Sequence, residues 1–229
     1  MPKSETRKPK SKDRPRTAPS GVAWDKLMSE LAAAHLLTGS PGERALGLAM
    51  SAWVGAGDPN RAEVEMRQCW HACYMIAMLL REAGIAANPL PVEVQVLRDG
   101  QCVERIGSLE PRHENGGKTW NGHVVLQIPE LGVVFDPTIG QGRFAVTDRL
   151  RSPVLIRNPQ LVRRAPAGSQ FQVLRPPQLS LVYTVTHSGE RVDQNPLYPL
   201  QKQEIDAAVQ RCRPFFLEGV NRLEGLTQA

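Results

Sequence analysis

One segment of this chain constrains its fold more than any other, a nearly uninterrupted apolar run over residues 69–83. Only three of these fifteen positions are neither apolar nor aromatic. A helix that is apolar almost all round must be covered on every side, so this run predicts a buried central helix. Gly84 follows directly and is expected to cap the C-terminus of that helix.

The part of the chain after this helix alternates apolar and polar residues in short runs, as half-buried strands do. Asp99-Gly100 predicts a hairpin turn between two such runs. We expect the stretches 110–121 and 140–178 to be irregular, because they are rich in polar residues, Gly and Pro. The predicted strands are 92–97, 101–106, 123–128, 133–136 and 179–186.

Helical patterns lie mainly before the predicted strands, and one more closes the chain. The predicted helices, besides the central one, are 24–37, 43–54, 58–66 and 201–223. Helices first and an antiparallel sheet afterwards are typical of an α+β fold. The sequence therefore predicts a single α+β domain over residues 21–229, with the apolar helix packed on the sheet.

The net charge of +5 belongs entirely to residues 1–20, which hold seven basic and two acidic residues. The rest of the chain has 21 of each sign, so its charges cancel. A tail with almost nothing apolar to bury is expected to be disordered. It predicts a solubilising tail, or at most an arm that binds nucleic acid or an acidic surface weakly.

Several classes of protein do not fit the composition. The longest clean apolar run, 75–80, is far short of the ~20 residues that a membrane helix requires. The basic N-terminal stretch has no apolar segment behind it, as a secretory signal would. Four cysteines at irregular spacing do not form a disulfide framework, so reduced thiols and a cytoplasmic location are expected. The oligomeric state has no signal in the sequence.

The residues that carry chemistry begin with Cys69, at the predicted start of the apolar helix. Free backbone N–H groups and the helix dipole there would favour a thiolate over a thiol. A nucleophilic thiolate needs an acid–base partner, normally a His, and a group that orients the His. The chain offers His123 at the start of one predicted strand and Asp136 at the end of its neighbour.

The spacing of these strands lets the two residues meet. With a four-residue turn at 129–132, Ile128 pairs with Val133, and His123 and Asp136 become diagonal neighbours on one face. A slip of one residue would place them on opposite faces. This register predicts a hydrogen-bonded pair.

The same residues carry a resemblance to a known superfamily. The motifs are CWHACYMIAMLLREAGI (69–85), PVEVQV (91–96), NGHVVLQ (121–127) and VVFDPT (133–138). This ordered set resembles the core of the transglutaminase-like, or papain-like, cysteine enzymes over roughly residues 60–140. The resemblance implies Cys69 as the nucleophile, His123 as the general base and acid, and Asp136 as the residue that orients the His. We expect neither a metal nor a cofactor.

Other interpretations of these residues stay open at this point. A cysteine near a buried helix is most often a small core residue. Cys69 and Cys73 are spaced as a metal pair could be, but His71 points away from them and no four-ligand set emerges. Asp136 could simply cap a turn before Pro137.

The function predicted from the whole pattern is cysteine-dependent acyl transfer on an amide of a protein or peptide. Resolution of the thioester by water would make the chain a peptidase, amidase or deamidase, and resolution by an amine would make it a crosslinking transglutaminase. Another hypothesis is a catalytically silent binding module with the same fold. Arylamine acetyl transfer uses similar residues, but the Arg-Gly-Gly run that precedes its cysteine is missing.

Overall fold

A computed structural model describes most of the region that carries the motifs. The described residues are 36–55, 69–116, 119–139, 153–157, 165–175, 179–186, 189, 191–194 and 198–225. The basic tail and the predicted helix 58–66 lie outside these ranges, as does the predicted helix 24–37 apart from its last two residues.

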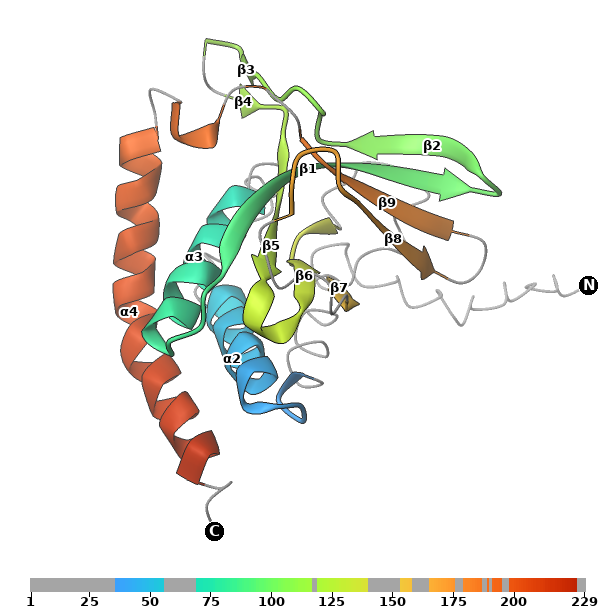
Figure 1. The fold of residues 1–229 in the computed structure, drawn as a ribbon. Helices are drawn as coiled ribbons and strands as arrows, with labels where there is room; N and C mark the ends of the chain where they lie inside the picture. The colour runs from blue at the N-terminus through green and yellow to red at the C-terminus, as the bar shows by residue number, and fades with distance from the viewer. Residues whose placement is uncertain are drawn as a thin grey trace, which may run out of the picture.

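The predicted α+β class is confirmed. Helices α2 (Pro41–Gly55), α3 (Cys69–Glu82) and α4 (Tyr198–Gly225) lie on one side of the molecule, and a large sheet lies on the other (Figure 1). Short 3₁₀ turns η3 (Pro129–Leu131) and η6 (Val192–Gln194) connect some of these elements.

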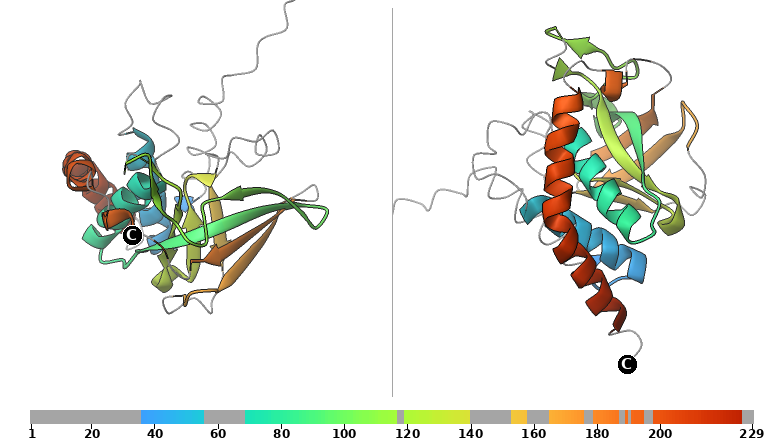
Figure 2. Two further views of the ribbon diagram at one scale, coloured as in Figure 1. Left: turned by 90° about the horizontal axis from the view of Figure 1, so that it is seen from above. Right: turned by 90° about the vertical axis from the view of Figure 1, so that its left-hand side faces the viewer.

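The main sheet has seven strands, and all of its pairs are antiparallel. Six strands run in the order β7-β6-β5-β1-β9-β8, and β2 pairs with the far half of β1. The sheet curls strongly, so that β8 and β9 turn back over the face opposite the helices (Figure 2). Its strands are β1 (Asn88–Arg98), β2 (Gln101–Ile106), β5 (His123–Ile128), β6 (Val133–Asp136), β7 (Val154–Arg157), β8 (Gln170–Arg175) and β9 (Leu179–Val185).

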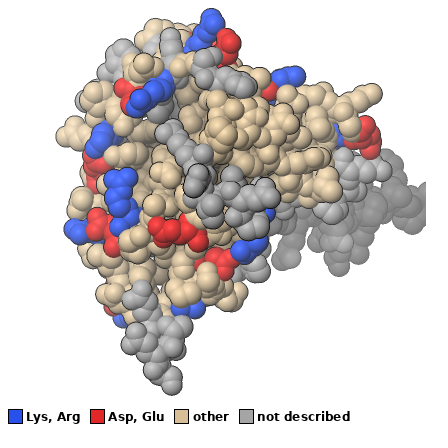
Figure 3. Space-filling model, viewed as in Figure 1, with Lys and Arg blue, Asp and Glu red and all other residues tan. Residues whose placement is uncertain are grey.

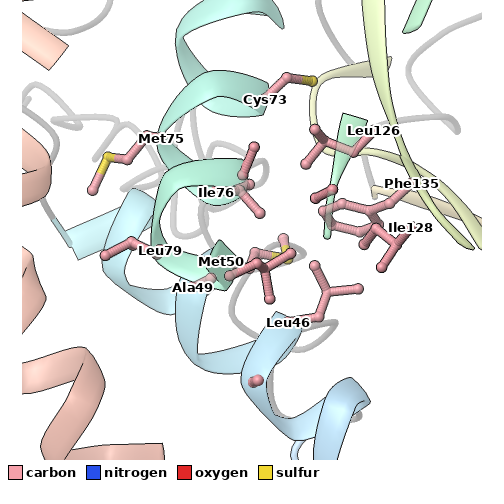
Figure 4. Close-up of a cluster of buried hydrophobic side chains, with 14 of the residues drawn as sticks. Leu46, Ala49, Met50, Cys73, Met75, Ile76, Leu79, Leu126, Ile128 and Phe135 are labelled. Atoms are coloured by element: carbon pink, nitrogen blue, oxygen red, sulfur yellow. The ribbon is translucent and has the colours of Figure 1, made fainter. Parts of the chain in front are cut away.

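The helices form two layers over the sheet. α3 packs directly on β5, with α2 beside it, and α4 covers α2 and α3 from outside (Figure 2). The predicted central helix therefore is central, with helices on one side and a sheet on the other. Figure 4 shows its core, in which α2 contributes Leu46, Ala49 and Met50, α3 contributes Cys73, Met75, Ile76 and Leu79, and the sheet contributes Leu126, Ile128 and Phe135.

Strand β5 is buried along its whole length because both of its faces are covered. Val124, Leu126 and Ile128 belong to the cluster under the helices. Val125 belongs to a second apolar cluster, enclosed by the curled sheet. His123 is on the same face of the strand as Val125, so the sheet encloses it too.

The ends of two helices have clear local causes. α2 begins at Pro41, two residues before the predicted start, because Ser40 and Glu43 cap it reciprocally. The Ser40 N–H donates to Glu43 Oε2 at 2.8 Å, and the Glu43 N–H donates to Ser40 Oγ at 3.3 Å. α3 ends where Gly84 takes a left-handed conformation (φ 74°), as predicted.

Strand β1 begins at Asn88, four residues before the predicted strand at Val92. Pro89 and Pro91 argue against a strand in the sequence, because proline lacks a donor. The carbonyl of Pro91 accepts the Thr186 N–H at 3.1 Å, so the polar groups of Pro91 face the side of β9. β5 pairs with the other edge of β1, so Pro91 removes no hydrogen-bond donor from the ladder between β1 and β5.

Two stretches predicted to be irregular contain strands. Within 110–121, His113–Glu114 (β3) pairs with Thr119–Trp120 (β4) as a small separate sheet. Within 140–178, β7 pairs with β6 and β8 pairs with β9. Their partners are distant in the sequence, and the many Gly, Pro and Arg residues around them hide the alternation.

α4 is longer than predicted, since it spans Tyr198–Gly225 with Pro214 inside it. On the face that Figure 3 shows, positive and negative side chains alternate over this helical side of the molecule. This mixture agrees with the cancelling charges of residues 21–229. Among the helices that the structure describes, none is long and apolar enough to cross a membrane.

Candidate functional site

Three element ends bring the predicted site residues together. Cys69 is the first residue of α3, His123 is the first residue of β5, and Asp136 is the last residue of β6. All three side chains are buried, with exposed fractions of 7%, 2% and 0%. Residues 56–68, which precede Cys69, lie outside the described part of the chain.

The strand register that joins His123 to Asp136 is the predicted one. Ile128 pairs with Val133, and the turn between them ends at Gly132, which is left-handed (φ 60°). Since side chains alternate along each strand, His123 and Asp136 project from the same face.

The His123 ring is held by the carboxylate of Asp136. Nε2 of His123 lies 2.9 Å from Oδ2 of Asp136 and donates a hydrogen bond to it. The other oxygen, Oδ1, accepts the backbone N–H of Thr138 at 3.0 Å. Asp136 therefore does bind the backbone of the turn that follows it, as a capping residue would, but only with one oxygen. Its second oxygen is left for the imidazole.

Cys69 contacts the other side of the same imidazole. The side chains of Cys69 and His123 are hydrogen-bonded to each other. Because Nε2 faces Asp136, the ring nitrogen left for the thiol is Nδ1. The three residues therefore lie in the order sulfur, imidazole, carboxylate.

The electrostatics of the pair favour a protonated imidazole. Burial alone would lower the pKa of His123, because it disfavours the charged form. The negative charge of Asp136 and the hydrogen bond to it outweigh this, and with the contribution of Cys69 they raise the pKa of His123 to about 10. His123 thus carries a positive charge at neutral pH.

Cys73 lies one turn further along α3 and is in a different environment. It is fully buried, and its thiol donates to the carbonyl of Val124 at 3.3 Å. Burial first, and then the charges of Cys69 and Asp136, raise the pKa of Cys73 well above its ordinary value. Cys73 is a core thiol, which ties α3 to the start of β5.

Trp70 packs between helices and does not line an open cleft. Its ring stacks on Tyr74 with centroids 5.2 Å apart, and Tyr198 of α4 meets it edge-on at 5.0 Å. Only 6% of Trp70 is exposed. This aromatic cluster joins the first turns of α3 and α4 next to Cys69.

Gly107 supports His123 from behind, and sequence reasoning missed it. One edge of β1 pairs with β5 up to Val92 and with β2 from Val94 onward, so this edge changes its partner between the two residues. Gly107 fills the junction with φ 79°, and a Cβ there would lie 2.8 Å from the His123 Cβ and 2.7 Å from the Val92 oxygen. A glycine directly after a predicted strand was the available signal.

Tyr183 of β9 is the second residue that was missed. Its hydroxyl donates to Oδ2 of Asp136 at 3.1 Å, and the side chain is completely buried. Its position in an alternating strand gives no hint of this contact, because the contact depends on how far the sheet curls.

The remaining cysteines stand apart from this site. All four thiols are free, Cys102 is exposed on β2, and Cys212 is half-buried on α4. Within the described ranges, no group of three or more His, Cys, Asp or Glu residues could hold a metal ion.

The arrangement combines the Cys69 sulfur, a cationic imidazole and a buried carboxylate. These groups are able to stabilise a thiolate and to transfer a proton between the sulfur and a bound molecule. In the comparisons with known proteins, no family model, curated protein or solved structure matches this chain.

Proposed function

We propose that this chain is a cysteine-dependent acyl-transfer enzyme that acts on an amide of a protein or peptide. In this proposal Cys69 is the nucleophile, His123 is the general acid and base, and Asp136 orients His123. The observation that carries it is the buried hydrogen bond between His123 and Asp136, with Cys69 on the free side of the imidazole. A fold of the transglutaminase-like, or papain-like, type is part of the same proposal.

The first half of the reaction forms a thioester. The cationic imidazole of His123 stabilises a thiolate on Cys69. The thiolate attacks the carbonyl carbon of the amide, a C–S bond forms, and the carbonyl electrons move onto oxygen. His123 then gives its Nδ1 proton to the amide nitrogen, the C–N bond breaks, and an amine or ammonia leaves.

The second half regenerates the enzyme. The neutral His123 takes a proton from an incoming nucleophile, which attacks the thioester carbon and expels the Cys69 sulfur. Water as nucleophile gives hydrolysis, and a second amine gives crosslinking. We propose hydrolysis, as a peptidase, amidase or deamidase, with transglutaminase chemistry as the alternative. The backbone N–H of Cys69 is the proposed donor to the oxyanion.

An electrophilic activity-based probe on the full chain tests the proposal. The probe should label wild-type protein at neutral pH, and Cys69→Ala should abolish the labelling. Cys102→Ala is a matched control, because it removes an exposed thiol far from His123 and should leave labelling of Cys69 intact. Labelling that survives Cys69→Ala and disappears with Cys102→Ala would refute the assigned nucleophile.

A peptide mixture then separates the possible reactions. Mass spectrometry distinguishes backbone cleavage, loss of ammonia from a side-chain amide, and incorporation of an added primary amine. Each product must be absent with Cys69→Ala. Incorporation of the amine in excess of hydrolysis would favour the transglutaminase alternative.

A catalytically silent binding module is the second candidate. The observation that favours it is the burial of all three side chains, which leaves little of the sulfur open to a substrate. Such a module predicts that none of the four thiols reacts faster than an ordinary cysteine at neutral pH.

A further inference from the structure

Asp136 accepts a third hydrogen bond that the proposed triad does not use. The Tyr183 hydroxyl donates at 3.1 Å to Oδ2, the same oxygen that accepts His123 Nε2–H at 2.9 Å. The Thr138 N–H occupies Oδ1. Asp136 is completely buried, so these three donors stand in for the water that an exposed carboxylate would have.

The contact depends on the curl of the sheet. Tyr183 lies on β9, and β5 and β1 separate that strand from β6, which carries Asp136. Three strand spacings amount to about 14 Å in a flat sheet, too far for a tyrosine side chain to cross. In the curled sheet the side chain of Tyr183 crosses the enclosed interior and ends on the carboxylate. Its position is fixed by pairs with Val94 on one side and Phe171 on the other.

The chemistry of the contact is one-directional. An ionised carboxylate only accepts hydrogen bonds, so the Tyr183 O–H must donate. Its contribution matters most when His123 is neutral, because Asp136 then lacks a positive neighbour in a site without water. While His123 is charged, the imidazolium itself balances the carboxylate.

From this geometry we infer that Tyr183 is a positioning residue of the site: it holds the Asp136 carboxylate aligned with His123 and stabilises it as an anion while the imidazole is neutral. The inference deepens the proposed acyl transfer and depends on it for its catalytic meaning. In that reaction His123 becomes neutral when it protonates the leaving amine. Tyr183 would therefore favour proton donation without touching the substrate.

The test is a pH titration of His123 in the full chain, monitored by NMR with ¹⁵N-labelled histidine. A Cys69→Ala background removes the contribution of the sulfur and brings the titration to lower pH. The histidine signal is assigned with His123→Gln. Tyr183→Phe should raise the midpoint of this titration by about one pH unit. Without the tyrosine hydroxyl, Asp136 keeps only the Nε2–H donor on Oδ2 and depends more on the positive charge that His123 loses when it becomes neutral. Tyr198→Phe, which removes a hydroxyl of the aromatic cluster, should leave the midpoint unchanged.

A second variant keeps the test decisive if Tyr183→Phe fails to fold. Selective incorporation of 3-fluorotyrosine, with Tyr74→Phe and Tyr198→Phe, leaves Tyr183 as the only labelled site among the three tyrosines. The fluorinated hydroxyl is a stronger donor, so the His123 midpoint should fall. An unchanged midpoint in the variants that fold, or an equal change in the Tyr198→Phe control, would overturn the inference.

The outcome of this titration does not depend on whether the proposed function is correct. The titration requires no substrate and no reactive thiol. If Cys69 proves unreactive while the midpoint still responds to Tyr183, the acyl-transfer proposal fails but the coupling of Tyr183 to His123 stands. If Cys69 is reactive and the midpoint does not respond, only the role of Tyr183 fails.

Discussion

Nε2 of His123 and Oδ2 of Asp136 lie 2.9 Å apart, and neither side chain is appreciably exposed. The two residues are 13 positions apart on adjacent antiparallel strands. A buried carboxylate that meets an imidazole in this way fixes both the orientation and the tautomer of the ring. The consequences of this pair can be tested one residue at a time.

Asp136→Asn should lower the activity by about 10³- to 10⁴-fold. The Oδ1 of the new asparagine would keep the hydrogen bond from the Thr138 N–H, so the amide N–H₂ group of this asparagine would face His123 Nε2. That nitrogen would have to accept, and the remaining ring proton would sit on Nδ1, where it blocks proton transfer from Cys69. The measurement is the rate of the amide reaction or of probe labelling. The melting temperature serves as a check, because a large drop would mean that the loss of activity comes from unfolding.

Cys69 and Cys73 form a matched pair for a reactivity test, since they lie one turn apart on α3. At pH 6 we expect iodoacetamide to label Cys69 on the order of 10- to 100-fold faster than Cys73, because only Cys69 contacts cationic His123. Mass spectrometry of a Cys102→Ser variant, freed of its exposed thiol, measures both rates.

His123→Ala is the control for access to the sulfur. The substitution opens space beside Cys69, so a reaction limited by access would become faster. A reaction that depends on the cationic imidazole would become slower, which is the expected outcome. Equal and slow labelling of Cys69 and Cys73 in the native protein would identify Cys69 as a core residue.

The register of β5 and β6 could be predicted because it is local. The turn at 129–132 contains a proline and a left-handed glycine, and the apolar alternation on both sides allows one pairing. The first and last residues of these strands, His123 and Asp136, were therefore placed correctly from the sequence. The same holds for α3, whose apolar run requires cover on every side.

Features that depend on distant parts of the chain could not be predicted. The contact between Tyr183 and Asp136 spans 47 positions and exists only because the sheet curls. β7 and β8 owe their pairing to β6 and β9, so their own composition does not reveal them. The early start of β1 at Asn88 depends on which edge of the strand its prolines face, and that is decided by the partner strands.

Gly107 offers a test of how His123 is supported. Gly107→Ala should displace the backbone of His123, because the new Cβ would lie within 3 Å of three backbone or Cβ atoms. Gly100→Ala is the matched control, since Gly100 has the same left-handed conformation (φ 80°) and open space around it.

The two glycine variants should differ in kind. Gly100→Ala should cost only the left-handed strain, about 1–2 kcal/mol of unfolding free energy. Gly107→Ala should lower the unfolding free energy by more than this, and it should also slow the alkylation of Cys69. Chemical denaturation and labelling rates give the two readouts. Similar values for both variants would show that Gly107 does not support the site.

Glu104 on β2 is a buried acid outside the candidate site. It is 5% exposed, and its Oε2 has no hydrogen-bond partner. Burial raises the pKa of Glu104 to about 7, because the charged form loses its water. The folded protein therefore binds a proton at Glu104 more tightly than the unfolded chain does.

This difference makes the stability depend on pH in a defined direction. Between about pH 4.5 and 7 the folded state holds the proton that the unfolded state has lost, so the contribution of Glu104 to stability falls as the pH rises. Glu104→Gln keeps the shape and removes the charge, so it should raise the melting temperature at pH 8 by about 2–5 °C. At pH 3.5, well below both pKa values, Glu104 is protonated in both states and the variant should melt close to the wild type. Thermal melts of both proteins at the two pH values decide the matter, and an equal gain at both would show that the charge of Glu104 is not the cause.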